Sequence, residues 1–153
     1  EGFTQDEVLA LAAAVERGSE HPLGAAIVAG AQERELELAE TQDFSSTTGE
    51  GIEAKVDGRR VAIGNEKLMA SHGIDEPEWL ASAEEGRSEG QTVMFVAVDG
   101  APAGLLAVAD PIKETTPAAI RAIHDRGIHL VMLTGDSRAT AEAVARQLGI
   151  DEV

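Results

Sequence analysis

Thr134, Gly135 and Asp136 form a short polar loop with an apolar segment before it and a helical pattern after it. Residues 128–133 are mostly apolar, as is typical of a buried parallel strand, and apolar residues then recur at helical spacing as far as Leu148. Ligands of open α/β sheets bind where such a strand ends, and the N–H groups at the start of the next helix suit an anion. The loop therefore indicates a phosphate contact, although an ordinary turn with a helix cap fits the same pattern.

A second motif joins an acid and an imidazole. Glu20 and His21 stand in the sequence Ser-Glu-His-Pro, and a helix is predicted to begin near Pro22. An imidazole can stack on a flat base and a carboxylate accepts hydrogen bonds, so the pair could bind a ligand. A solvated surface turn is the alternative interpretation of the same residues.

Glycines mark two further candidate positions. Gly49 and Gly51 precede a predicted strand instead of following one, so they do not match the dinucleotide-binding fingerprint and indicate a close approach of the backbone. Gly64 and Asn65 stand between a predicted strand and a predicted helix, where the glycine could serve backbone geometry and the asparagine could cap the helix. The remaining histidines lack the spacing of metal ligands: His72, His124 and His129.

The composition narrows the possible functions. The chain has 153 residues, of which 43% are hydrophobic, and this suits one or two small globular domains. Its formal net charge of −16 would repel nucleic acid and anionic lipid, so neither is an expected partner. Without cysteine there is no disulfide and no thiolate metal site. No apolar stretch approaches the roughly 18 residues of a membrane span, and no signal peptide is recognisable.

Local signals predict helices and an antiparallel sheet in the first part of the chain. Thr4 and Glu7 match a capping box that opens a helix to about Arg17. The dipeptides at 57–58 and 99–100 are both Asp-Gly between strand-like segments, which is a strong hairpin signal. Two such hairpins imply an antiparallel sheet.

The segment between the hairpins predicts further helices at about 65–71 and 77–87, and the acidic, glycine-spaced EEGRSEG segment predicts a solvated loop. From Asp110 the pattern changes to a hinge, a helix, a tight turn and the apolar segment 128–133. Too few strands follow for a complete parallel sheet, so we expect a second, incomplete domain.

Taken together, the motifs resemble the large cytoplasmic loop of heavy-metal-transporting P-type ATPases. The segments that carry the resemblance are, in order, SEHPLGAAIV, TGEGIEAKVDGRRVAIGN, ADPIKETTPAAI and GIHLVMLTGDSRATAEAVARQLGIDEV. SEHP, G-x-G and GN are typical of that family's nucleotide-binding domain, and GN resembles the copper-exporting branch more than the zinc, cadmium and lead branch. The last block resembles the part of the phosphorylation domain that contains TGD.

This resemblance implies an α/β (α+β) fold in two parts. Residues 1–106 would form an ATP-binding domain, an antiparallel sheet flanked by helices. Residues 107–153 would form part of a phosphorylation domain, a haloacid-dehalogenase-like Rossmannoid segment with the TGD loop and a hinge at Asp110 and Lys113.

The resemblance also implies roles for the motif residues. His21 would pack on the adenine ring, and Glu20 would accept a hydrogen bond from its exocyclic amino group or orient around it. The residues that would bind or enclose the nucleotide are Gly49, Gly51, Ile52, Gly64 and Asn65. The loop residues would act in phosphoryl transfer: Thr134 would bond a phosphoryl oxygen, next to Gly135, and Asp136 would lie near the nucleotide and the hinge.

The expected ligand is ATP or ADP, with Mg²⁺ required by the complete pump and no metal site in this chain. The expected partners are the pump's remaining phosphorylation, actuator and membrane domains, at the cytoplasmic face of a membrane that this segment does not itself contact. The family's DKTGT nucleophile segment and GDGxND segment are absent from the sequence, so we expect binding without turnover.

Other functions also fit parts of the pattern. The module could belong to a zinc, cadmium or lead pump instead of a copper pump. It could also be a non-catalytic fold or a fragment of a haloacid-dehalogenase-type phosphatase, although no D-x-D-x-T occurs.

Overall fold

The computed structural model describes residues 2–109, 112–135 and 138–153, and the chain divides into two compact units. Unit 1 comprises Glu1–Leu80 with Val93–Val108, and unit 2 comprises Ala81–Thr92 with Ala109–Val153. Asp110 and Asp136, expected at the hinge and in the phosphoryl loop, lie outside the described residues. Among the described residues no helix is long and apolar enough to cross a membrane.

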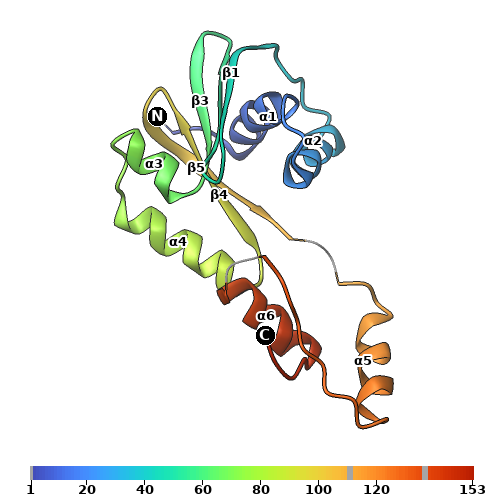
Figure 1. The fold of residues 1–153 in the computed structure, drawn as a ribbon. Coiled ribbons are helices and arrows are strands. Elements are labelled where there is room, and N and C mark those ends of the chain that lie inside the picture. Colours follow the sequence, from blue (N-terminus) through green and yellow to red (C-terminus); the bar gives the residue numbers. More distant parts are fainter. Residues whose placement is uncertain (1, 110–111, 136–137) are drawn as a thin grey trace. The chain divides into compact units, whose positions relative to one another are not determined.

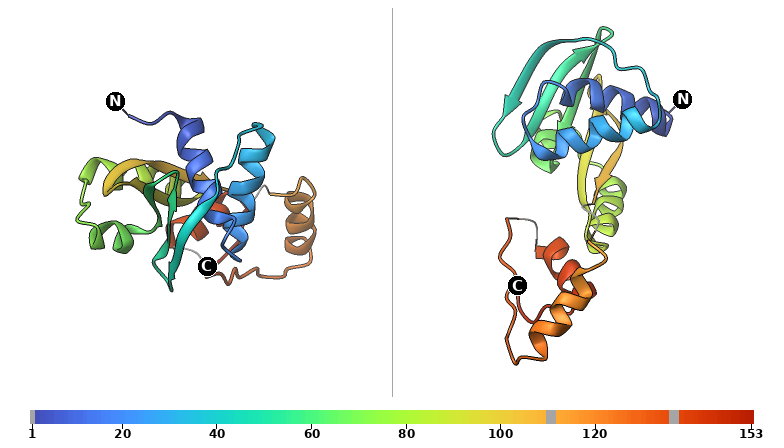
Figure 2. Two further views of the ribbon diagram at one scale, coloured as in Figure 1. Left: turned by 90° about the horizontal axis from the view of Figure 1, so that it is seen from above. Right: turned by 90° about the vertical axis from the view of Figure 1, so that its right-hand side faces the viewer.

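Two helices open unit 1. Helix α1 spans Gln5–Glu16 and begins with the predicted capping box, in which the Glu7 N–H donates to Thr4 Oγ1 at 3.3 Å and the Thr4 N–H donates to Glu7 Oε2 at 2.8 Å. Helix α2 spans Pro22–Glu33, with proline in its first turn as expected. The two helices lie side by side (Figure 2).

The sheet of five strands is antiparallel in the three pairs whose register is known, and its strands follow one another in chain order. These are β1 (Thr41–Thr47), β2 (Gly51–Val56), β3 (Arg59–Gly64), β4 (Thr92–Val98) and β5 (Ala101–Val108) (Figure 1). Positive φ angles of 49° and 81° at Asp57 and Gly58, and of 52° and 78° at Asp99 and Gly100, confirm both predicted hairpin turns. Strand β1, which is polar and largely exposed, was not predicted from the sequence.

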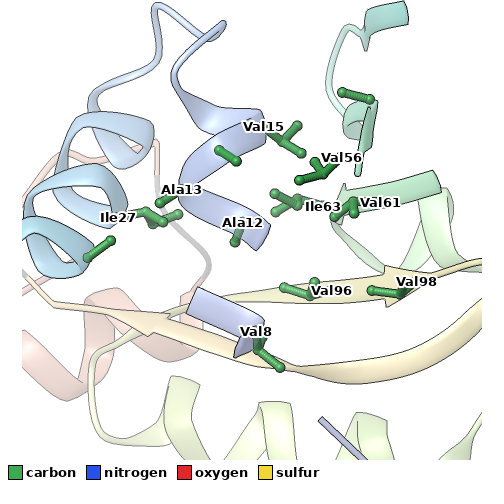
Figure 3. Packing of buried hydrophobic residues seen from close by; sticks show 13 residues of the cluster. Val8, Ala12, Ala13, Val15, Ile27, Val56, Val61, Ile63, Val96 and Val98 are labelled. Atoms are coloured by element: carbon green, nitrogen blue, oxygen red, sulfur yellow. The ribbon is translucent and has the colours of Figure 1, made fainter. Parts of the chain in front are cut away.

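Helix α1 forms the main core against one face of the sheet. Its apolar residues meet alternate residues of the strands, namely Val56 on β2, Val61 and Ile63 on β3, and Val96 and Val98 on β4 (Figure 3). Because strand side chains alternate between the two faces, these residues cover one face only. On β4 the neighbouring Phe95 contacts Trp79 edge to face, with ring centroids 5.0 Å apart.

The segment between β3 and β4 contains α3 (Glu66–Ser71) and α4 (Pro77–Ser88), close to the predicted positions. The expectation of a solvated loop over EEGRSEG was wrong for most of its length, because α4 continues to Ser88 and a turn follows only at Glu89 and Gly90. Glycine in this helix weakened the helical signal, but it does not prevent helix formation.

Unit 2 contains α5 (Thr116–His124) and α6 (Arg138–Leu148). The expectation of a buried parallel strand at 128–133 was wrong: only a single parallel bridge joins Val131 to Glu152, and Leu133 is 100% exposed. A parallel strand is buried when neighbouring strands and helices cover it, and among the described residues only Glu152 pairs with this segment.

We expect the amides of residues 128–133 to exchange with solvent much faster than those of Val93–Val98. The strand β4 is paired and largely buried, whereas residues 128–133 are mostly exposed, and local stability follows burial and hydrogen bonding. Hydrogen–deuterium exchange followed by mass spectrometry compares the two peptides directly. Equal protection of both segments would contradict this assignment.

Candidate functional site

A hollow of about 400 Å³ lies where the end of α1 meets α2. It is lined by both residues of the predicted acid and imidazole pair, Glu20 and His21, and by Glu16, the last residue of α1. The rest of the lining combines apolar residues of α2, namely Pro22, Ala25, Val28 and Ala29, with the polar residues Arg17, Ser19 and Gln32. The structure therefore places the Ser-Glu-His-Pro motif at a concave surface with apolar walls, which is the usual setting of a small-molecule site.

His21 is held in place by the helix that it caps. The ring Nδ1 of His21 accepts a hydrogen bond from the Leu23 N–H at 3.2 Å, and the backbone N–H of His21 donates to Ser19 Oγ at 3.2 Å. Because Nδ1 acts as the acceptor, a neutral ring has its proton on Nε2. The imidazole itself stays exposed. It is thus a flat side chain with a fixed position at the rim of the hollow.

Glu16 is a buried acid with an incomplete set of partners. The residue is 6% exposed, and its Oε2 has no hydrogen-bond partner among the described residues. A Cβ on Gly24 would collide with this same oxygen, so the absence of a side chain at Gly24 leaves room for the carboxyl group. A buried polar atom without a partner costs stability, and in natural proteins it calls for an explanation.

Burial raises the pKa of the Glu16 carboxyl above its usual value of 4.5. A hydrogen bond from the Ser19 side chain and the charge of His21 act in the opposite direction but do not cancel the effect. A carboxyl group with a raised pKa and an unpaired oxygen at a hollow is a typical feature of a binding site.

Glu16 was not among the site residues predicted from the sequence, although a signal was present. Val8, Ala12 and Glu16 follow one another at intervals of four, so they share one face of α1. Val8 and Ala12 both belong to the core. An acidic residue on the buried face of a helix, three residues before the Ser-Glu-His-Pro motif begins, is the pattern that would have identified it.

The predicted glycines form a second cluster in unit 1. Gly51 and Gly64 are register partners at the ends of β2 and β3. A Cβ on Gly64 would collide with the carbonyl oxygen of Glu50, and a Cβ on Gly51 would collide with the carbonyl oxygen of Ile63. The two strands approach so closely that neither position has space for a side chain. The need for glycine at both positions therefore arises within the protein itself.

Asn65 ties this cluster together. Its Nδ2 donates to the Gly49 carbonyl oxygen at 2.7 Å, and its backbone N–H donates to the Glu50 carbonyl oxygen at 2.9 Å. Its Oδ1 accepts from the first turn of α3, so it is also the helix cap that the sequence allowed. Gly49 is exposed, with φ at 75° and nothing near its missing side chain. Ile52 lies on β2 and packs against the core.

The predicted site residues thus fall into separate groups. Glu20 and His21 line the hollow with Glu16, whereas the glycines and Asn65 form the cluster at the ends of β2 and β3 and do not line that hollow. Thr134 and Gly135 are exposed residues of unit 2. Within the described ranges, no group of three or more histidine, aspartate or glutamate residues could hold a metal ion.

The three histidines without metal-ligand spacing contact carboxylates. His72 Nε2 lies 2.9 Å from Glu53 Oε1, and His124 Nε2 lies 2.9 Å from Asp151 Oδ2. His129 is more exposed, and its closest carboxylate contact is 3.6 Å. In each case the carboxylate belongs to a different segment of the chain from the histidine.

Comparison with known proteins identifies the class. A family model for haloacid dehalogenase-like hydrolases matches residues 3–153, and the chain therefore belongs to that family. Within it, the copper-transporting P-type ATPase of Rhizobium leguminosarum bv. viciae is 53% identical over 149 residues, and the copper-exporting P-type ATPase of Legionella pneumophila subsp. pneumophila is 52% identical over 151 residues. The resemblance predicted from the motifs is confirmed.

These matches cover nearly all of this chain but little of its relatives. They span 97% and 99% of the chain but 18% and 20% of the two relatives, so the chain spans about a fifth of their length. The crystal structure of a zinc-transporting PIB-type ATPase in an E2.Pi state matches 99% of the chain with a TM-score of 0.79 at 35% identity, and 24% of that structure is covered. The mixed fold with an antiparallel sheet agrees with the predicted fold class.

We predict that Gly64→Ala destabilises the protein by about 1–3 kcal/mol, because the added methyl group overpacks a backbone contact. Gly30→Ala is the matched control: Gly30 lies within α2 with open space around it, so alanine there should stabilise the helix by about 0.5–1 kcal/mol. Urea denaturation measures both. Equal effects of the two substitutions would contradict the proposed close approach of β2 and β3.

Glu16→Gln should raise the free energy of unfolding near pH 7 by on the order of 1 kcal/mol, because a neutral amide replaces a buried ionised carboxyl group. The stability linked to protonation of Glu16 is complete below its usual pKa of 4.5 and is lost as the pH rises through the raised value. The gain should therefore shrink as the pH falls towards 4.5. Thermal denaturation between pH 4.5 and 7 measures this gain in stability. Glu20→Gln, at an exposed position, is the control. A gain in stability that does not change with pH would refute the assignment of a buried, ionised Glu16 carboxyl group.

Proposed function

We propose that unit 1 binds the adenine base of ATP or ADP in the hollow at the ends of α1 and α2. The observation that carries this proposal is the buried Glu16 carboxyl group, with one oxygen unpaired, beside the exposed His21 imidazole in a hollow with apolar walls. A ligand with a hydrogen-bond donor would give the Glu16 oxygen a partner, and a flat apolar face on the same ligand could stack on the His21 ring. Adenine offers both.

Each side chain has a distinct role in this proposal. The His21 ring, oriented by its hydrogen bond from the Leu23 N–H, stacks on the base. The Glu16 carboxylate accepts from the exocyclic amino group of adenine, and guanine would present a carbonyl oxygen at the corresponding position. Glu20 was expected in this role, but it is exposed at the rim, so we assign it a supporting contact around the amino group.

The glycine cluster is proposed to form another boundary of the nucleotide site. Gly49 exposes its backbone, and Asn65 holds that backbone by the hydrogen bond to the Gly49 carbonyl oxygen. Gly51, Ile52 and Gly64 would act by shaping this part of the sheet. Their direct contribution to binding is smaller, because their close packing already involves other residues of the chain.

The wider function proposed is that of an ATP-binding module of a copper-translocating P-type ATPase. Copper-transporting relatives at 53% and 52% identity support copper over zinc, cadmium or lead. The proposed domains are those expected from the sequence, 1–106 for ATP binding and 107–153 for part of the phosphorylation domain. Thr134, Gly135 and Asp136 would contact the phosphoryl group during its transfer to an aspartate that this chain lacks.

The proposed setting is the cytoplasmic face of a membrane, with the other pump domains as partners. We assign recognition of the base to the side chains that line the hollow. The absence of D-x-D-x-T disfavours a phosphatase fragment. A match to copper-transporting ATPases that covers 97% of the chain also favours the pump.

We predict that the chain binds ATP and ADP with a dissociation constant of about 0.1–1 mM, or about 4–5.5 kcal/mol, with little dependence on Mg²⁺. The net charge of −16 gives phosphate groups no long-range attraction, so affinity rests on the base. His21→Ala should weaken ATP several-fold, since stacking contributes about 1 kcal/mol or more. GTP should bind poorly.

Calorimetry or amide-shift titration measures these affinities. His129→Ala removes an exposed imidazole from unit 2 and should leave ATP affinity unchanged. Thr134→Ala should also have little effect, because its phosphoryl partner depends on parts of the phosphorylation domain that this chain lacks. Equal affinity of the wild type and His21→Ala would refute the adenine site.

A further inference from the structure

An irregularity in β1 changes the direction of two adjacent side chains. Gln42 pairs with Lys55 and Ser45 pairs with Glu53, so Asp43 and Phe44 together oppose the single residue between them on β2. This is a β-bulge, and Asp43 adopts a φ of 55° to form it. Bulges of this kind frequently redirect side chains beside functional sites.

The two side chains make contacts in different places. Asp43 Oδ2 lies 2.6 Å from Lys55 Nζ on the neighbouring strand. Phe44 instead lies against Gly18, in the short segment between α1 and the Ser-Glu-His-Pro motif. The bulge thus lets β1 form an ion pair within the sheet and also reach the segment that leads to His21.

The ring of Phe44 accounts for the glycine at position 18. A Cβ on Gly18 would lie 3.0 Å and 3.1 Å from two ring carbons, which is tighter than normal packing. Gly18 is not among the glycines with positive φ, so its backbone conformation does not itself require glycine. The ring therefore leaves a side chain at position 18 less than normal packing space.

We propose that Phe44 is a positioning residue for the nucleotide site: its contact with Gly18 fixes segment 18–21 and thereby sets the position of the His21 ring. The same strand continues to Thr47, whose carbonyl oxygen accepts from the Glu50 N–H in the turn with Gly49. β1 thus connects the segment before His21 to the glycine cluster. This inference rests on the proposed binding of adenine nucleotide. It adds a residue that belongs neither to the lining of the hollow nor to the glycine cluster.

The exposure of Phe44 separates this role from that of a core residue. Phe44 is 40% exposed on an edge strand, whereas the buried residues that hold α1 to the sheet are 6% exposed or less. Removal of the ring should therefore alter segment 18–21 more than the stability of unit 1.

The first test is independent of the ligand. In Phe44→Ala, the amides of Ser19, Glu20, His21 and Leu23 should exchange with solvent several-fold faster than in the wild type, while the amides of β3 and β4 keep their protection. Phe44→Tyr retains the ring and should restore wild-type exchange. Phe3→Ala, which removes an aromatic ring that lies against Arg59, is the matched control and should not affect these amides. Unchanged exchange at 19–23 in Phe44→Ala would overturn the proposal.

The second test uses ATP titration of the same proteins, well below their melting temperatures. Phe44→Ala should weaken ATP about three- to tenfold, and Phe44→Tyr should bind as the wild type does. Gly18→Ala should weaken ATP in the wild-type background but have no further effect in Phe44→Ala, because the ring that its methyl group would displace is absent. Additive effects of the two substitutions would overturn the coupling.

The outcomes distinguish this inference from the function on which it rests. If the wild type binds ATP and His21→Ala weakens it, but Phe44→Ala binds normally, only the positioning role fails. If His21→Ala binds ATP as the wild type does, the adenine site fails, and the exchange experiment alone then decides whether Phe44 fixes segment 18–21.

Discussion

The architecture of unit 1 depends on a helix that is buried on more than one side. Five consecutive residues of α1, from Ala12 to Glu16, are all buried. Because successive helical residues are rotated by about 100°, five in a row cannot face a single neighbour. Three of them are alanines, whose small side chains let both α2 and the sheet approach closely. This double contact leaves the last residue, Glu16, without an exposed side.

The burial of Glu16 links the fold to the proposed function. An acid at the end of a buried helix would ordinarily be replaced by an apolar residue, because a lone carboxyl group weakens the folded state. Here the surrounding residues accommodate it: Gly24 leaves space for the oxygen, and Ser19 donates a hydrogen bond. Residues that tolerate a destabilising group are consistent with a site whose ligand supplies the missing partner.

The sequence predicted those elements that depend on local interactions. The capping box at Thr4, the proline at the start of α2 and both Asp-Gly turns act within a few residues, and each was located correctly. Strand β1 was missed because an exposed edge strand needs no apolar alternation, and its bulge interrupts the period of two.

The remaining differences arise from tertiary contacts. Residues 128–133 have the composition of a buried strand, but burial depends on covering elements that composition does not encode. For the candidate site, the sequence placed the Ser-Glu-His-Pro motif at the start of a helix, and His21 does cap α2. The burial of Glu16 was missed because it depends on the elements that pack around the end of α1. The close approach of β2 and β3 at Gly51 and Gly64 was likewise missed, because it follows from the register of the two strands.

The edges of the sheet also affect how this protein behaves among its own copies. An open edge can add a strand from another molecule, and this is a common route to aggregation. At one edge, the bulge in β1 breaks the regular row of hydrogen-bonding groups, and the Asp43 and Lys55 ion pair stands beside it. At the other edge, β5 has Pro102 near its start, which lacks an N–H to donate. The bulge that redirects Phe44 thus also protects the protein against self-association through the sheet.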